Sequence, residues 1–182
     1  MNIDTLLNRY FGDASSLPTI EVFDNDNIYD VYVDIVKTLK NSPDIELGVL
    51  QLLSYCFYEI LDNVLTHSGK KTGTVLMYYE PERSSIKILV ADDGMGFGLY
   101  STICLIKNAG IVMEIHSGQH LLRTDGETEQ VNEAPLWQGT IIYFELHTDR
   151  EIDPNSILEN RADAESEFNE TFIDTSDLDE LW

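Results

Sequence analysis

Apolar residues recur along this chain at spacings that alternate between those of helices and those of strands. In residues 45–66 they recur every three or four positions, which predicts one long helix and the strongest one in the chain. Residues 28–39 fit a second helix, which Ser42 and Pro43 would end. The segment ahead of these, up to Leu17, is a short amphipathic start broken at Gly12 and Pro18.

Strands are predicted where apolar residues alternate or cluster between turn-forming residues. Thr19–Phe23 alternates as a strand does, and Thr74–Tyr79 and Ser85–Ala91 form a predicted hairpin around the turn at residues 80–83. Further strands are predicted over Val112–Ile115, Leu121–Leu122 and Thr140–Leu146, and a third helix over Leu99–Ala109, which Gly110 would end.

Length and charge pattern together predict one domain followed by an acidic tail. The chain has 182 residues, 43% of them apolar, which suffices for a single core. Asp149–Trp182 carries 12 acidic and 2 basic residues, so we place the domain at residues 1–148 and the tail at 149–182. Bulky apolar residues mixed with acids near its end are typical of a segment that docks on a partner protein, and a solvated, disordered tail is the alternative.

The overall charge narrows the classes of partner. Eleven Lys and Arg residues against 33 Asp and Glu give a net charge of −22, a field that repels nucleic acids and anionic membrane surfaces. Neither an export signal in the first ten residues nor an apolar run long enough to cross a bilayer is recognisable. The two cysteines, Cys56 and Cys104, lie in apolar runs, which favours a reducing compartment. We therefore expect a cytoplasmic protein that binds neither nucleic acid nor membrane.

A polar stripe interrupts the long apolar helix. Glu59, Asn63 and His67 stand four residues apart, so they project from nearly the same helix face. A carboxylate there can accept a proton from water, and an amide oxygen can ligate Mg²⁺ beside phosphate oxygens. The alternative for this stripe is an ordinary exposed helix surface, which is usually polar.

A second group of candidate residues follows the strand at 85–91. Asp92 stands where ligands commonly bind, and its carboxylate can only accept hydrogen bonds, such as one from the amino group of adenine. Gly94 and Gly96 would let the backbone approach a ligand closely, although a simple tight turn is the alternative. Gly98 and Leu99 open the predicted third helix, whose free amide groups would face an anion. Thr140, at the start of the last strand, offers a hydroxyl.

Taken in order, these residues resemble the motifs of the GHKL ATPases. The order is Glu-x-x-x-Asn-x-x-x-His on a helix, Asp-x-Gly-x-Gly after a strand, Gly-x-Gly-Leu opening a helix, and Gly-Thr before a strand. This superfamily of histidine kinase-like ATPases includes gyrase-type, chaperone, histidine-kinase and mismatch-repair ATPases and serine kinases that act as anti-sigma factors. The resemblance covers residues 47–146. It implies an α/β fold, a two-layer sandwich of a mixed, mostly antiparallel sheet with helices on one face and the nucleotide between the layers.

The resemblance also implies a role for each candidate residue. Glu59 matches the catalytic base that activates water or the phosphoryl acceptor, and Asn63 the Mg²⁺ ligand. Asp92 matches the residue that binds the adenine amino group. The remaining matches are His67, Gly98 and Leu99 beside the phosphates, Gly94 and Gly96 as the glycines after the aspartate, and Thr140 behind the adenine. ATP and Mg²⁺ are the cofactors implied.

One departure from the family pattern bears on activity. In the family a mobile lid of about a dozen residues or more separates the two glycine motifs and closes over the phosphates. Here both motifs share Gly96 within residues 92–99, so the lid is missing. Two hypotheses remain open: a regulatory protein that binds ATP and hydrolyses it or phosphorylates a separate protein, and a non-catalytic interaction module that acts through the open cleft or the acidic tail.

Overall fold

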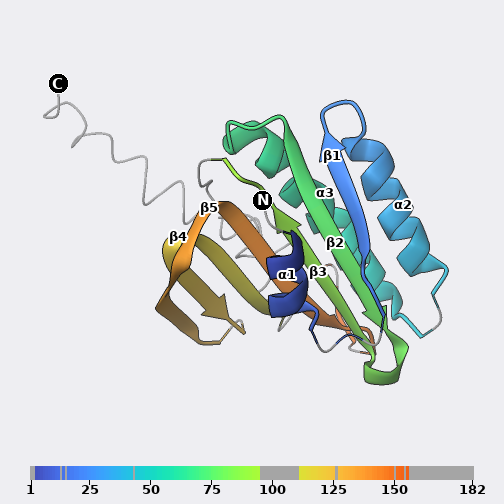
Figure 1. The fold of residues 1–182 in the computed structure, drawn as a ribbon. Coiled ribbons are helices and arrows are strands. Elements are labelled where there is room, and N and C mark those ends of the chain that lie inside the picture. The colour runs from blue at the N-terminus through green and yellow to red at the C-terminus, as the bar shows by residue number, and fades with distance from the viewer. Residues whose placement is uncertain are drawn as a thin grey trace, which may run out of the picture.

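The protein is built on one five-stranded antiparallel sheet, seen in a computed structural model (Figure 1). The structure describes residues 3–12, 14, 16–42, 44–94, 111–125, 127–149, 151–153 and 155. Within them the strands lie in the order β1-β2-β3-β5-β4. Their bounds are β1 Thr19–Asp24, β2 Thr72–Glu80, β3 Ser85–Ala91, β4 Val112–Thr124 and β5 Glu129–His147. Every pairing between these strands is antiparallel, where a mixed sheet was expected.

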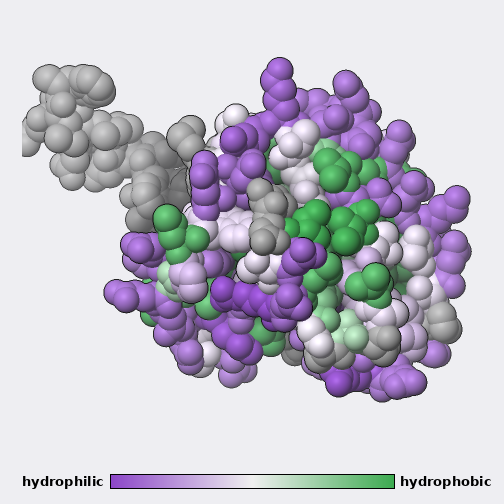
Figure 2. All heavy atoms as spheres, in the orientation of Figure 1, coloured by the Kyte–Doolittle hydropathy of each residue, from purple (hydrophilic) through white to green (hydrophobic). Residues whose placement is uncertain are grey.

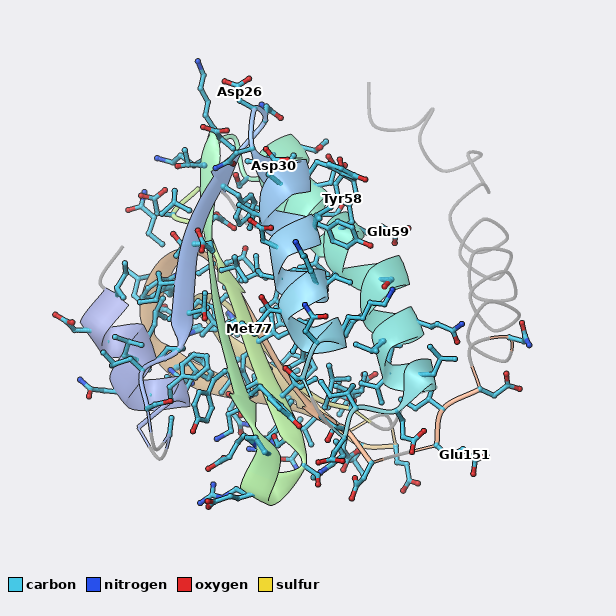
Figure 3. All side chains as sticks on the ribbon, turned by 90° about the vertical axis from the view of Figure 1, so that its right-hand side faces the viewer. Asp26, Asp30, Tyr58, Glu59, Met77 and Glu151 are labelled. Carbon is cyan, nitrogen blue, oxygen red and sulfur yellow. The ribbon has the colours of Figure 1, made fainter. Side chains whose placement is uncertain are left out.

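Two helices cover one face of the sheet and form the main core with it. They are α2, Ile28–Lys40, and α3, Leu47–His67, which confirm the two helices predicted from apolar spacing. Figures 1 and 3 show both helices on the same side of the sheet. Phe57 and Leu61 of α3 are almost fully buried in this layer together with Phe23 of β1. Burial of such apolar side chains is the main source of stability, at about 1.5–3 kcal/mol for each large side chain.

The short first helix lies on the opposite face, so the expectation of helices on a single face is wrong. Leu6 and Tyr10 of α1, Ile3–Tyr10, stand one turn apart and pack with Leu89 and Tyr143 of the sheet. The ring centroids of Tyr10 and Tyr143 are 4.8 Å apart. Burial raises the pKa of the Tyr10 hydroxyl to about 12. The chain therefore has a second, smaller core between α1 and the sheet.

The predicted hairpin of β2 and β3 is confirmed, and its turn includes a short 3₁₀ helix, Pro81–Arg83. Ser84, at φ 48°, closes the turn in the left-handed conformation.

The last two strands are much longer than predicted. Three short strands were expected, but β4 and β5 form one continuous hairpin, with irregular register between Ser117 and His120. The Nη1 atom of Arg123 lies 3.1 Å from Oε1 of Glu114, nine residues earlier on the same strand. Nine residues of straight strand would span about 30 Å, so β4 turns back on itself at the irregularity. The outer half of β5 is mostly exposed and lacks the alternation of buried positions on which the prediction depended.

Two predicted features lie in parts of the chain that the structure does not describe. The helix predicted over residues 99–109 lies outside the described residues, as does almost all of the acidic tail. The described part of the chain contains no helix with the length and apolar character needed to cross a bilayer.

Candidate functional site

The candidate site is centred on Asp92, directly after the last residue of β3. Asp92 is fully buried, and its backbone N–H donates to the carbonyl oxygen of Thr140 on β5, at 3.0 Å. Oδ1 of its carboxylate accepts a hydrogen bond from the backbone N–H of Gly94, at 2.7 Å. The structure thus brings together three residues that the sequence analysis selected from two separate motifs.

Two buried oxygen atoms in this place have no hydrogen-bond partner among the described residues. They are Oδ2 of Asp92 and Oγ1 of Thr140, whose residue is 1% exposed. Burial raises the pKa of the Asp92 carboxyl above its usual value, and the hydrogen bond from the backbone N–H of Gly94 partly counteracts this. Buried polar atoms are nearly always hydrogen-bonded, so a pair of unpartnered ones indicates a place where a ligand or water completes the bonding.

Glycines make the close packing around Asp92 feasible. A Cβ atom at Gly94 would lie 2.0 Å from the carbonyl oxygen of Ser68, just after the end of α3. A Cβ atom at Gly139 would lie 2.2 Å from the carbonyl oxygen of Asp92, and Gly139 has a φ of +102°. The end of β3 is therefore pressed between the end of α3 and the middle of β5.

The polar stripe of α3 leads away from this junction. Glu59 and Asn63 are both partly buried. With a rise of about 1.5 Å per residue, Asn63 lies about 7 Å and Glu59 about 13 Å along the helix axis from Ser68. Figure 3 shows Glu59 on the side of α3 remote from α2. Of the two, Asn63 is therefore the nearer to the Asp92 junction along the helix axis and Glu59 the more distant.

Some predicted site residues are placed only in part or not at all. His67 is the last residue of α3, but its side chain is outside the described part of the structure. Gly96, Gly98 and Leu99 also lie outside the described residues. The described site is therefore the part predicted to bind the base, together with the α3 stripe.

Two side chains at this junction were not found by the sequence analysis. The indole N–H of Trp137 donates to the carbonyl oxygen of Asp92, at 3.4 Å, and holds the backbone before the glycines. Nζ of Lys70 lies 3.9 Å from Oδ1 of Asp93, and both side chains are nearly half exposed. Lys70 is a cation close to the site in a strongly acidic chain. In the sequence, the position of Lys70 just after the predicted long helix was the only sign that it could lie near the site.

No metal site formed by protein side chains alone is found in the part of the chain that is described. There, no three His, Cys, Asp or Glu side chains are grouped so as to hold an ion. Nε2 of His116 lies 2.9 Å from the carbonyl oxygen of Pro135, and burial lowers the pKa of its ring. This hydrogen bond joins His116 of β4 to β5 within the hairpin.

A hollow of about 700 Å³ lies between α1 and the segment that follows it. Leu7, Phe11 and Leu17 line it, and none of the predicted site residues does.

Comparison with known proteins identifies no relative of this chain. A scan of the chain against models of protein families finds no match, and a search of curated proteins finds no similar sequence.

Proposed function

We propose that this protein is a regulatory protein that binds ATP in a Mg²⁺-dependent way, on a sandwich of the GHKL type. The single observation that carries the proposal is the pair of buried, unpartnered oxygens on Asp92 and Thr140. The resemblance in motif order supports it, because the residues matched to the adenine site come from distant parts of the sequence and lie together.

The chemistry of this pair fits adenine better than guanine. A carboxylate only accepts hydrogen bonds, whereas a hydroxyl can donate or accept. Adenine offers an amino group, a donor, beside a ring nitrogen, an acceptor, which matches Oδ2 of Asp92 and the hydroxyl of Thr140. Guanine carries an acceptor oxygen where adenine has its amino group, and that oxygen would be repelled by the carboxylate. Selectivity for ATP over GTP is the expected consequence.

The α3 stripe supports a role in binding the phosphates. The amide oxygen of Asn63 suits Mg²⁺, which is usually held by one or two protein ligands together with phosphate oxygens and water. When bound, the ion would neutralise charge on the phosphates. Glu59, one turn earlier, is the residue to accept a proton from an attacking water or hydroxyl group. Hydrolysis and phosphoryl transfer to a separate protein share this requirement, and the missing lid predicts slow turnover in either case.

The test is calorimetric titration of the full chain with ATP and Mg²⁺, repeated with GTP. Asp92→Asn replaces a buried acceptor by a group that can donate, so ATP affinity should fall about 10- to 100-fold. The matched control is Asp93→Asn, which makes the same change at the next, half-exposed residue and should leave affinity within about twofold.

Turnover is tested separately from binding. Glu59→Gln should retain ATP affinity and lower the rate of phosphate release at least about 100-fold, as loss of a general base does. If neither the wild-type chain nor Asp93→Asn binds ATP at millimolar concentration, the nucleotide proposal is wrong. The alternative of a non-catalytic interaction module then replaces it.

A further inference from the structure

The outer edge of β1 presents backbone hydrogen-bonding groups in an unusual arrangement. Among the described strands β1 pairs only with β2, so its other edge is open. Figure 3 shows the molecule from this side, with β1 at the edge of the sheet and α2 beside it. At the end of β1 the side chain of Asn27 turns back onto this edge. Its Nδ2 donates to the carbonyl oxygen of Val22, at 3.0 Å, and its Oδ1 accepts from the N–H of Asp24, at 2.7 Å.

These two bonds show which residues of β1 face outward. In an antiparallel pair, alternate residues direct both backbone groups toward the partner strand, and those between direct both away from it. Because Val22 and Asp24 point away from β2, Ile20 does so too. Asn27 occupies the place that one residue of an added strand would take. Within the described residues, the groups left open along this edge are the N–H and C=O of Ile20 and the N–H of Val22. Continued one step back from the start of β1, the same alternation also directs the C=O of Pro18 outward.

This set is complementary to itself. Place a second copy of β1 antiparallel to the first, with Ile20 opposite Ile20 of the second copy. Each Ile20 then donates its N–H to the carbonyl oxygen of the other, and each Val22 donates to the carbonyl oxygen of Pro18 across the axis. Proline has no N–H to return, and the carbonyl oxygen of Val22 needs none, because Asn27 already donates to it. Four bonds form, and no outward group in the paired segment is left over.

The side chains along this edge agree with the same register. Phe23 is buried on the α2 and α3 side, so Ile20 and Val22 lie on the opposite face, where they are 39% and 55% exposed. Figure 2 shows hydrophobic residues gathered on this face, over the region of β1 and β2. In the symmetric pairing Ile20 meets Ile20 and Val22 meets Pro18, which gives a continuous apolar row. Glu21, on the other face, meets the hydroxyl of Thr19 rather than another acid.

We propose that the chain forms a two-fold homodimer through β1, with Ile20 at the axis and one continuous ten-stranded sheet. The net charge of −22 on each copy opposes the association, so the dimer is favoured by salt. This proposal is independent of nucleotide binding.

Sedimentation of the full chain over a range of concentrations tests the dimer. The wild-type chain should approach twice its mass of 20.7 kDa, at lower concentration as ionic strength rises. Ile20→Pro removes an N–H that points away from β2, so the native ladder keeps its bonds while the dimer loses two. Its dissociation constant should rise about tenfold or more. Ile20→Val, which keeps the N–H, is the matched control and should dimerise as the wild-type chain does.

Disulfide crosslinking tests the register even if Ile20→Pro fails to fold. In Ile20→Cys the two Cα atoms would face each other at about 5.5 Å, within the range of a disulfide, so mild oxidation should link the copies. In Val22→Cys the two cysteines would be four residues out of register, about 13 Å apart, and should give no more linked dimer than the wild-type chain with its own two cysteines.

Three outcomes would overturn the proposal. One is a wild-type chain that stays monomeric at every concentration and salt level. Another is a dimer that folded Ile20→Pro leaves unchanged. The third is linkage at Val22→Cys with none at Ile20→Cys, which would show a different register or a different interface.

Discussion

At the scale of single residues, the site is marked by polar groups buried without partners. Asp92 and Thr140 carry one such oxygen each. Among the described residues outside this site, one such atom is also found on each of Tyr10, Glu80, His116 and Thr148. Each unpartnered buried polar group costs about 1–3 kcal/mol of stability. For Asp92 and Thr140 the cost is offset when a ligand supplies the missing bonds, whereas Thr148 lies outside the proposed site.

Thr140→Val should change the stability of the fold and the affinity for ATP in different ways. Valine has nearly the shape of threonine without the unpartnered hydroxyl, so the free energy of unfolding should stay the same or rise by up to about 1 kcal/mol. ATP affinity should fall about 3- to 10-fold, as for one lost neutral hydrogen bond. Thr148→Val is the matched control: urea unfolding should show the same gain, and calorimetry no change in affinity. Equal loss of affinity in both variants would contradict the assignment of Thr140.

Burial of Asp92 also gives stability a defined pH dependence. Its folded-state pKa is raised above the ordinary value of 3.8, so between the two values the native state holds a proton that the unfolded chain has released. This contribution therefore lowers stability as pH rises through that window, and the loss persists above it. Relative to wild type, Asp92→Asn should gain stability as the pH rises above about 4, measured by urea unfolding. Wild-type and Asp92→Asn profiles that stay parallel would contradict this.

At the scale of elements, the site exists because the ends of β3 and α3 meet the middle of β5. Gly94 contacts the end of α3, and Gly139 contacts the backbone of Asp92. Neither position has room for a Cβ atom. The site is thus a junction of backbone segments as much as a set of side chains.

Gly139→Ala should therefore disrupt the junction. The positive φ costs about 1–2 kcal/mol for alanine, and the contact with the Asp92 carbonyl raises the total above about 3 kcal/mol. Gly118→Ala is the matched control, since Gly118 also has a positive φ, +60°, but has nothing within 4 Å of its Cβ position. It should cost only about 1–2 kcal/mol in urea unfolding. If both variants lose the same unfolding free energy, the junction can accommodate a Cβ atom at Gly139 without further loss of stability.

At the scale of the whole molecule, the excess of negative charge is the main electrostatic feature, and it lowers the stability of the fold. The chain carries 33 acidic and 11 basic residues, and like charges on a compact fold repel each other. Salt screens this repulsion over about 10 Å at 0.1 M ionic strength. The charge therefore makes stability sensitive to ionic strength in general.

The free energy of unfolding should rise with added NaCl, by on the order of 1 kcal/mol between about 0.02 and about 0.3 M. Urea unfolding at each salt level measures it. KCl at equal ionic strength should give the same gain if screening is the cause. A loss of stability with salt would show that attractive surface ion pairs outweigh the repulsion.

The sequence by itself determined the elements whose signals are local. Apolar spacing predicted α2 and α3, and turn residues predicted the hairpin of β2 and β3, because one buried face imposes a fixed period on its own segment. The order of polar motifs also selected Asp92, Gly94 and Thr140 as neighbours in one candidate site. Their roles toward ATP and Mg²⁺ stay predictions.

Only the tertiary structure decided which faces and edges meet. The amphipathic pattern of α1 does not say which side of the sheet it covers, and the exposed outer half of β5 is held by cross-strand pairing that leaves no period in the sequence. The unpartnered oxygens of Asp92 and Thr140, the contact of Trp137 and the role of Asn27 at the β1 edge all depend on segments distant along the chain or on turns in space. Such bonds are set by packing geometry, which a local pattern of residues does not encode.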